Sequence, residues 1–278
     1  MKKILFPTDF SSAANAAFTY AIFLADKMDA TIHCLHVYNL THAADMLAPS
    51  DIIAAIQEEE EDRALEQMEV YHRRIEEEAG KDIQIKPVLK TGFAADAIGE
   101  VCKTLKPDLV VMGTKGATNA LDKMLGSVTT AVIQTTAVPL LAIPESAIYS
   151  PIKRIAYATD FREKDHEVSA RLGGLASSLD ASVIAVHVAS PGEANFTEED
   201  HIKLLELYRK ETGLADLDLQ QVEGKDTADA LAGYMELQQV DVLALSTHRR
   251  SFLDRLFHRS LTRRLALYAS KPLLVFHS

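Results

Sequence analysis

The fold of this chain is decided by the stretch DLVVMGTKG at residues 108–116, which is followed after nine further residues by GSV at residues 126–128. The apolar run at the start of the stretch has the length and composition of a buried β-strand. Ser127 is a favourable N-cap residue, so a helix is predicted near residues 127–136. A strand, a glycine-containing loop and a helix N-terminus form a cradle whose backbone N–H groups and helix dipole favour a bound anion.

Each glycine of this loop has a predicted role. Gly113 is expected to turn the chain away from the strand, and Gly116 and Gly126 to keep Cβ atoms away from an approaching phosphate. The spacing matches neither a Walker A loop nor the G-x-G-x-x-G turn of dinucleotide-binding proteins. The sequence therefore predicts a phosphate site of a different type.

The pattern G-x2-G-x9-G-S resembles the ATP-binding signature of the universal stress protein family. The residues that flank it agree, and so does the opening strand, ILFPTDFS at residues 4–11. The resemblance covers the whole chain as two tandem copies, of which the first has the complete motif. It implies ATP as the ligand, with Mg²⁺ as an option. The implied site consists of Pro7, Thr8, Asp9, Val37, Met112, Gly113, Gly116, Gly126, Ser127 and Val128.

The resemblance also implies roles for individual residues. The family residue that matches Val37 contacts adenine through its backbone, and the match of Asp9 lies beside the adenosine. The hydroxyl group of the residue that matches Ser127 joins the loop amides on the phosphates. Asp9 has an alternative role that is purely local, because an aspartate between a strand and a helix also caps helices and forms turns.

An internal repeat divides the chain. The segment KILFPTDF at residues 3–10 recurs as RIAYATDF at 154–161, a displacement of 151 residues. From Asp96 onward the displacement falls to 133, so the second copy is 18 residues shorter. A short linker at residues 144–150 separates the copies, and we predict an N-terminal domain at 1–146 and a C-terminal domain at 147–278.

Each copy is predicted to be a Rossmann-like, doubly wound α/β domain with a parallel sheet and helices on both faces, because short apolar strands alternate with helices. Ligands of such sheets bind at the carboxyl ends of the strands. The resemblance implies five strands in the order 3-2-1-4-5. It also implies that the last strands of the two copies meet, as an intrachain pseudo-dimer, and a homodimer is a further option. In the first copy the strands are predicted near 2–8, 31–37, 83–89, 108–113 and 139–143, and the helices near 12–28, 52–79, 94–105 and 127–136.

The predicted helix at 52–79 belongs to the insertion that lengthens the first copy. It presents a series of apolar residues on one side, and the first helix carries an extra apolar face that includes Phe18 and Ile22. Packing of the long helix over that face is one explanation. A surface for a protein partner is the alternative. The acidic run at 58–62 is interpreted as a solvated face.

The second copy has lost the phosphate loop. Its sequence reads STHR at 246–249 and, after nine residues, Arg259-Ser260, so all three glycines are replaced. Residues 246–264 contain six arginines and one aspartate. We interpret this loop as filling its own cradle with side chains. An anion site for a regulatory ligand or a partner is the alternative, because arginine binds phosphate and carboxylate well.

Composition excludes several functional classes. A net charge of −11 argues against general binding to nucleic acids or anionic membranes. The sequence shows no signal-peptide pattern and no apolar run of membrane-spanning length. Two cysteines without metal-ligand spacing are typical of reduced, structural thiols, and no metal site is predicted. These features predict a cytoplasmic protein.

No catalytic residues are predicted, because the sequence contains no G-x-S-x-G elbow, no H-E-x-x-H pair and no kinase motif set. Phosphoryl transfer needs a positioned nucleophile and usually carboxylate-held Mg²⁺, and the motif supplies only Asp9. We therefore expect an adenine-nucleotide-binding stress-response protein that acts as a sensor or switch through an unknown protein partner. The alternatives are a slow ATPase and an interaction scaffold that needs no nucleotide.

The loss of the glycines predicts one nucleotide per chain. Arg249 and Arg259 place long side chains where Gly116 and Gly126 have none, and a glycine-type backbone conformation would be strained there. Isothermal titration calorimetry with ATP should give one site per chain, and Arg259→Ala should leave this stoichiometry unchanged. Two equivalent sites per chain would contradict the interpretation of the arginines.

Overall fold

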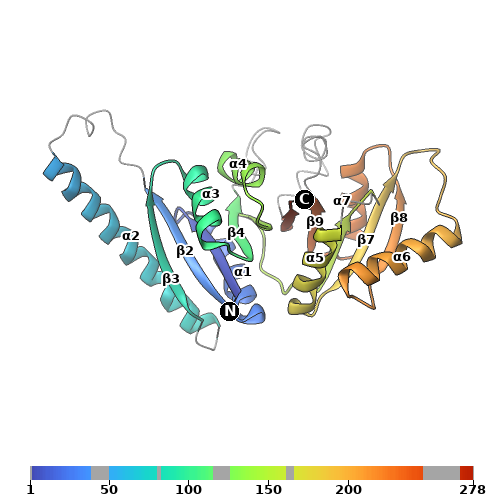
Figure 1. Ribbon diagram of the computed structural model, residues 1–278, viewed down its shortest axis with the longest axis horizontal. Coiled ribbons are helices and arrows are strands. Elements are labelled where there is room, and N and C mark those ends of the chain that lie inside the picture. The colour runs from blue at the N-terminus through green and yellow to red at the C-terminus, as the bar shows by residue number, and fades with distance from the viewer. Residues whose placement is uncertain are drawn as a thin grey trace.

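The computed structural model describes residues 2–38, 50–79, 83–114, 126–160, 166–246 and 270–277. Strands and helices alternate along both halves (Figure 1). The N-terminal half contains β1 (Lys2–Thr8), α1 (Ser12–Met28), β2 (Ala30–Tyr38), α2 (Ser50–Glu78), β3 (Ile85–Thr91), α3 (Ala94–Leu105), β4 (Leu109–Thr114), α4 (Ser127–Thr135) and β5 (Leu140–Pro144). The C-terminal half contains β6 (Arg154–Ala158), α5 (His166–Leu179), β7 (Ser182–Ala189), α6 (Glu198–Thr212), β8 (Asp218–Glu223), α7 (Thr227–Leu237), β9 (Val242–Ser246) and β10 (Leu273–Phe276). Every element predicted for the first copy is present.

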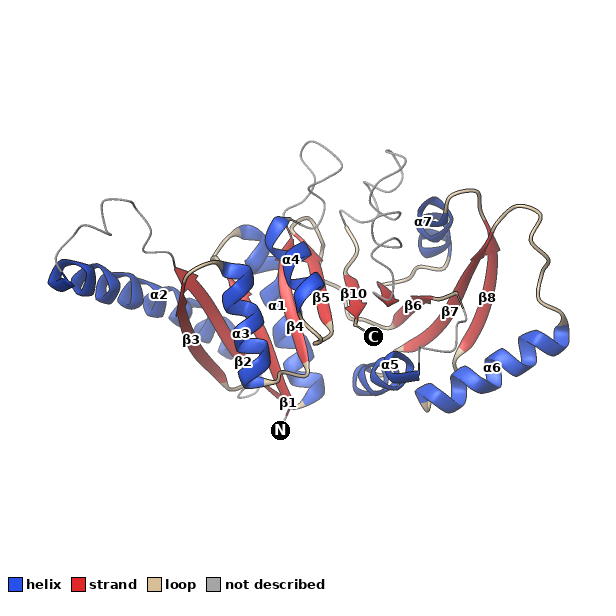
Figure 2. Ribbon diagram, turned by 45° about the horizontal axis from the view of Figure 1, so that its top comes forward, coloured by secondary structure: helices blue, strands red, loops and turns tan. Residues whose placement is uncertain are grey.

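The described strands form one continuous sheet in the order β3-β2-β1-β4-β5-β10-β9-β6-β7-β8. Counted within each half, this order is 3-2-1-4-5. Strands within a half are parallel, whereas β5 and β10 are antiparallel, with Leu141 opposite Leu274 and Ala142 opposite Leu273. Figure 2 shows these two strands side by side between the halves. The last strands of the two copies therefore meet as expected, and neither is left as an open apolar edge.

The two faces of the sheet have separate cores. One core contains residues of α1, α2, α5 and α6, and the other contains residues of α3, α4 and α7. Each core includes side chains from both halves of the chain. Successive strand residues alternate between the two cores, so that Phe6 packs on the first and Leu5 on the second.

The long helix α2 packs over α1. The ring centroids of Phe18 and Tyr71 lie 4.2 Å apart, and the Arg74 guanidinium lies 5.2 Å from the centroid of the Phe18 ring. The predicted packing of this helix over Phe18 is confirmed. The acidic run in α2 is not wholly solvated, because the Tyr38 hydroxyl donates to a Glu61 carboxylate oxygen at 2.5 Å.

The role predicted for Gly113 was wrong. Gly113 does not turn the chain off the strand; it lies within β4 and is paired with Ile143 of β5. A Cβ atom at this position would lie 2.3 Å from the carbonyl oxygen of Ala13, in the first turn of α1. Glycine is therefore required so that the backbone of α1 can approach β4, a contact between elements that a local motif does not reveal.

Gly113→Ala should lower the stability of the chain by about 3 kcal/mol, the upper end of the range for overpacking, because the clash is with backbone rather than a movable side chain. Gly99→Ala is the matched control: this glycine lies within α3, and a Cβ there meets no atom within 4 Å. The control should gain about 0.5–1 kcal/mol from helix propensity. Urea unfolding monitored by circular dichroism measures both. Equal midpoints for Gly113→Ala and the wild type would contradict the close approach.

Both cysteines are free and buried. Burial raises the pKa of the Cys34 thiol to about 12 and that of Cys102 to about 11. Because the thiolate is the nucleophile, both side chains stay in the unreactive thiol form at neutral pH.

Iodoacetamide at about pH 8 should therefore alkylate neither cysteine in the folded chain, whereas both should react in about 6 M guanidinium. Mass spectrometry after quenching measures the label. Rapid labelling of Cys34 in the native chain would contradict its buried position in β2.

Candidate functional site

A cavity of about 290 Å³ lies at the carboxyl edge of the N-terminal part of the sheet. It is bounded by the ends of β1, β2 and β4 and by the starts of α1, α3 and α4. Its lining consists of Pro7, Thr8, Asp9, Ser11, Ala13, Ala14, Leu35, Val37, Ala94, Ile98, Met112, Gly113, Gly126, Ser127, Val128 and Thr129. Nine of the ten predicted site residues line this one cavity. The tenth, Gly116, lies outside the described residues.

The sheet topology explains why these residues converge. Strand β1 is central, paired with β2 on one side and with β4 on the other, and all three are parallel. The chain leaves β1 toward β2 on one side of the sheet and leaves β4 toward β5 on the other side. The strand order therefore reverses between β1 and β4. Such a switch point leaves a crevice outside the carboxyl ends of the strands, which is where open α/β sheets bind ligands.

Helix α4 (Ser127–Thr135) starts where the predicted range 127–136 starts, but its N-cap is a different residue from the one predicted. The N-cap is Gly126, with φ 73° and ψ 152°, and Ser127 is the first helical residue. The prediction of Ser127 as the N-cap was therefore wrong. A positive φ favours glycine, so the conformation at 126 could not be given to a serine without strain. Gly126 has no side chain with which to cap the helix, and among the described residues a Cβ at this position would meet no atom within 4 Å.

The first turn of α4 faces the end of β4. Thr129, which lies in that turn, donates from Oγ1 to the carbonyl oxygen of Gly113 at 3.4 Å. This bond joins the helix start to the strand that carries the motif. The backbone N–H groups at the start of an α-helix have no partner within the helix, and the dipole makes this end positive. The cavity thus has one end suited to an anion.

Asp9 takes part in a local turn. Its Oδ1 accepts a hydrogen bond from the Ser11 backbone N–H at 3.1 Å, and its side chain is exposed. The N-cap of α1 is Ser11, whose hydroxyl oxygen accepts from the Ala14 N–H at 3.3 Å. Asp9 is therefore a turn former and not the helix cap. This turn holds the carboxylate at the rim of the cavity.

The end of β1 is fixed by side chains from two other elements. The hydroxyl groups of Thr8 and Tyr71 lie 2.9 Å apart, and His36 Nδ1 lies 2.9 Å from the Thr8 carbonyl oxygen. Phe10, at φ 60°, places its ring 4.7 Å from that of His36. Burial raises the pKa of Tyr71 to about 12, so this hydroxyl keeps its proton at neutral pH. The network connects the lining residue Thr8 to helix α2.

The same network recurs in the C-terminal half. The hydroxyl groups of Thr159 and Tyr208 lie 2.8 Å apart, and His187 Nδ1 lies 3.1 Å from the Thr159 carbonyl oxygen. Sequence reasoning missed both networks. The repeat contained a signal, because the threonine and histidine persist in the copy that has lost the glycines. Their persistence there identifies a structural role in placing the end of the first strand.

Sequence reasoning also missed the apolar floor of the cavity. Leu35 and Ile98 are almost completely buried beneath the lining, and Ala94 begins helix α3 at its side. Leu35 could have been found, because it lies two residues before Val37 and therefore on the same face of β2. Ile98 is brought to the site by helix packing, which has no local signal.

The corresponding edge of the C-terminal half is described in part. Ser246, the last residue of β9, stands where the repeat places Gly113 in the first half. The segment that follows it, 247–269, includes all six arginines and lies outside the described residues. The interpretation of that loop stays a prediction.

Among the described residues, no group of three or more His, Cys, Asp or Glu side chains is placed to hold a metal ion. No helix in the same part of the chain has the length and apolar character needed to cross a membrane.

Comparisons with known proteins agree with this architecture. The family model described as the universal stress protein family matches residues 1–144 and again residues 151–277. Universal stress protein MJ0531 of Methanocaldococcus jannaschii is 31% identical over 144 residues, covering 51% of this chain and 81% of that protein. Universal stress protein Slr1230 of Synechocystis is 24% identical over 295 residues, covering 99% of this chain and 100% of that protein.

The fold is shared with a solved structure over almost the whole chain. A universal stress protein from Archaeoglobus fulgidus superimposes with a TM-score of 0.71 at 16% identity, covering 99% of this chain and 98% of that one. The resemblance recognised from the glycine motif is confirmed by the family match over both halves. The chain therefore belongs to the universal stress protein family, and each of its two halves matches the family model.

Proposed function

We propose that this chain binds ATP or a closely related adenine nucleotide in the N-terminal cavity and acts as a nucleotide-dependent sensor or switch in a stress response. One observation carries the proposal: nine of the ten residues that the motif singles out, from four separate segments of the chain, line a single cavity at the switch point of the sheet. A motif that matched by chance would not bring these residues together.

The two ends of the cavity suit the two ends of a nucleotide. The side near Leu35, Val37 and Ile98 is apolar and would receive the base, with the Val37 backbone available for its polar edge. The opposite side is formed by Gly126 and Ser127 at the start of α4, where backbone N–H groups and the helix dipole favour phosphate. The bare Cβ position at Gly126 leaves room for the phosphate to approach the backbone.

The lining favours a binding protein over an efficient enzyme. Among the lining residues that the structure describes, Asp9 is the one carboxylate, and one of its oxygens accepts the turn hydrogen bond from Ser11. A carboxylate in this setting is a weak candidate for the positioned base that fast phosphoryl transfer needs. Binding, with a change in the structure around the site, is the function that these residues support best.

Helix α2 is placed to transmit the state of the site. It contacts the end of β1 through Tyr71 and Thr8, and the end of β2 through Glu61 and Tyr38. Both strands end at the cavity. A nucleotide that orders the turn after β1 would therefore also act on helix α2, which is longer than its counterpart in the second copy. A protein partner that binds α2 would then respond to the nucleotide.

ATP at about 100 times its Kd should stabilise the folded chain by roughly 2.7 kcal/mol, which is visible as a thermal shift. Gly126→Arg should abolish the shift, because the side chain fills the cradle and strains a backbone at φ 73°. Gly192→Arg is the matched control: this glycine has φ 86° and open space around it, but it lies in the other half. It should cost similar strain and leave the ATP shift intact.

Two results would defeat the proposal. One is the absence of any shift at about 1 mM ATP with Mg²⁺, a concentration that detects even weak sites. The other is equal loss of the shift in both arginine variants, which would show that strain and not the cradle is responsible.

A turnover assay separates the sensor from the slow ATPase. Under the sensor proposal, steady-state phosphate release by the wild type and by Asp9→Ala should both stay near the background of a buffer control. Sustained release by the wild type that disappears in Asp9→Ala would favour the ATPase.

A further inference from the structure

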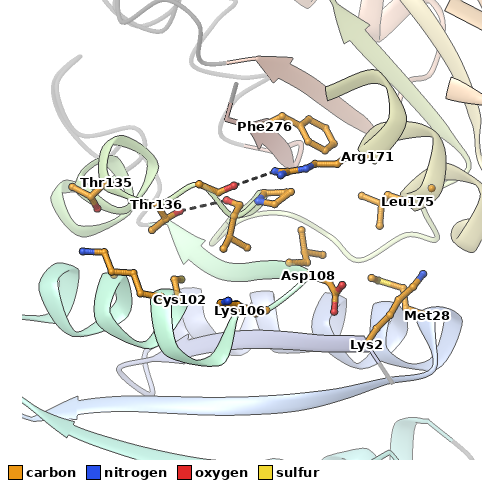
Figure 3. A pocket seen from close by; sticks show the side chains of 18 residues that line it. Lys2, Met28, Cys102, Lys106, Asp108, Thr135, Thr136, Arg171, Leu175 and Phe276 are labelled. Atoms are coloured by element: carbon orange, nitrogen blue, oxygen red, sulfur yellow. Dashed lines mark hydrogen bonds between the residues drawn. The ribbon is translucent and has the colours of Figure 1, made fainter. Parts of the chain in front are cut away.

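A second, larger cavity lies between the two halves at the other edge of the sheet. Its volume is about 680 Å³. One wall comes from the N-terminal half, from the start of β1, the start of β4 and the segment before β5; the other comes from α5 and Phe276 (Figure 3). Strands β1 and β4 begin at this edge and end at the nucleotide cavity, so the two cavities are separate. The volume falls within the range of small-molecule sites, roughly 300–1,000 Å³.

The lining combines positive charge with apolar surface. Four cations, Lys2, Lys103, Lys106 and Arg171, line the cavity, against one carboxylate, Asp108. This local excess stands out in a chain whose net charge is −11. Asp108 is engaged by the backbone, because its Oδ2 accepts from the Lys3 N–H at 2.8 Å. The apolar part of the lining comes from Met28, Leu109, Val138, Pro139, Leu175 and Phe276.

Hydrogen bonds between the halves hold the walls in place. Arg171 donates from Nη1 to the Ala137 carbonyl oxygen at 3.1 Å, and Lys2 donates from Nζ to Ser178 Oγ at 2.8 Å. Figure 3 shows Arg171 on one side of the cavity and Lys2 and Lys106 on the other. Both bonds cross from one half of the chain to the other beside the cavity. The site is therefore preformed, which lowers the cost of binding.

Two helical glycines line the cavity at positions where the surrounding packing does not require glycine. Gly99 of α3 and Gly174 of α5 both line it, and a Cβ on either would meet no atom within 4 Å. Gly173 differs, because its Cβ would lie 1.8 Å from the Thr212 carbonyl oxygen. Glycine within a helix lowers folding stability by about 0.5–1 kcal/mol relative to alanine. Glycine at these two positions therefore destabilises the fold without any gain in packing.

The repeat shows what else this position could hold. Gly174 aligns with Phe23 of the first copy, whose ring lies 5.8 Å from that of Tyr149. The first copy fills the position with an aromatic contact, and the second copy leaves it empty. The space beside α5 is therefore a property of this half and not of the fold.

From this lining we propose that the cavity between the halves binds a small organic anion with an apolar body. Its carboxylate or phosphate group would be held by Lys106 and Arg171, and its apolar part would pack on Leu175 and Phe276. Because the ligand contacts both halves, its binding also strengthens their association. The proposal is independent of nucleotide binding, since the two cavities share no lining residue.

Decanoate is a suitable probe, titrated into the full chain by calorimetry, with decan-1-ol as a neutral probe of the same tail. Decanoate should bind saturably at one site per chain, and decan-1-ol at least about tenfold more weakly. Gly174→Phe should fill the cavity and lower decanoate affinity by about tenfold or more, whereas the matched variant Gly174→Ala should keep it. Lys106→Gln tests the charge at a residue with no hydrogen bond or ion pair to the other half among the described residues, so it should weaken decanoate binding without loosening the contact between the halves.

Several outcomes would overturn the proposal. Equal affinity for decanoate and decan-1-ol would show that the negative charge does not contribute to binding. Equal affinity in Gly174→Phe and Gly174→Ala would place the probe elsewhere. Loss of decanoate binding in Gly126→Arg would place it in the nucleotide cavity. No saturable binding of decanoate, 1-naphthoate or decyl phosphate below about 1 mM would show that the cavity takes no such ligand.

Discussion

Helix α1 can begin directly against strand β4 only because residue 113 has no side chain: a Cβ there would lie 2.3 Å from the Ala13 carbonyl oxygen. This approach closes the first crossover tightly over the sheet. It places the turn at Asp9 beside the end of β4. The hydrogen bond from Thr129 to the Gly113 carbonyl oxygen then brings the start of α4 to the same place. The strand ends and the positive helix end are thereby brought to one cavity, and the site depends on this contact.

Much of the fold could be predicted from the sequence, because strands and helices leave patterns in short, contiguous stretches of residues. Alternating apolar strands and helices located the elements of the first copy, and the repeat predicted the same alternation for the second. The roles of Gly113 and Ser127 were misread. The approach of α1 to β4 depends on packing between distant segments, and the positive φ at Gly126, which makes that residue the N-cap, is a backbone conformation that residue types alone do not specify. Ile98 and the Tyr71–Thr8 bond were likewise invisible, since helix packing brings these residues to the site.

The two copies share one structural network but differ in where they carry glycine. The network of threonine, tyrosine and histidine at the end of the first strand is present in both halves, which fits a role in holding the sheet edge. The glycines of the phosphate loop persist in the first half only. In the second half, glycine appears instead at 174, where it opens the cavity between the halves. Under the two proposals, divergence after duplication has left one half for nucleotide and made the junction available to a different ligand.

A crystal structure of the chain grown with ATP would show directly whether the N-terminal cavity holds the nucleotide. We predict density for one nucleotide per chain, with the base beside the Val37 backbone and the phosphates over Gly126 and Ser127 at the start of α4. The aligned position beside Val188 should hold no adenine. A nucleotide bound in the C-terminal half, with the N-terminal cavity empty, would contradict this assignment of the site.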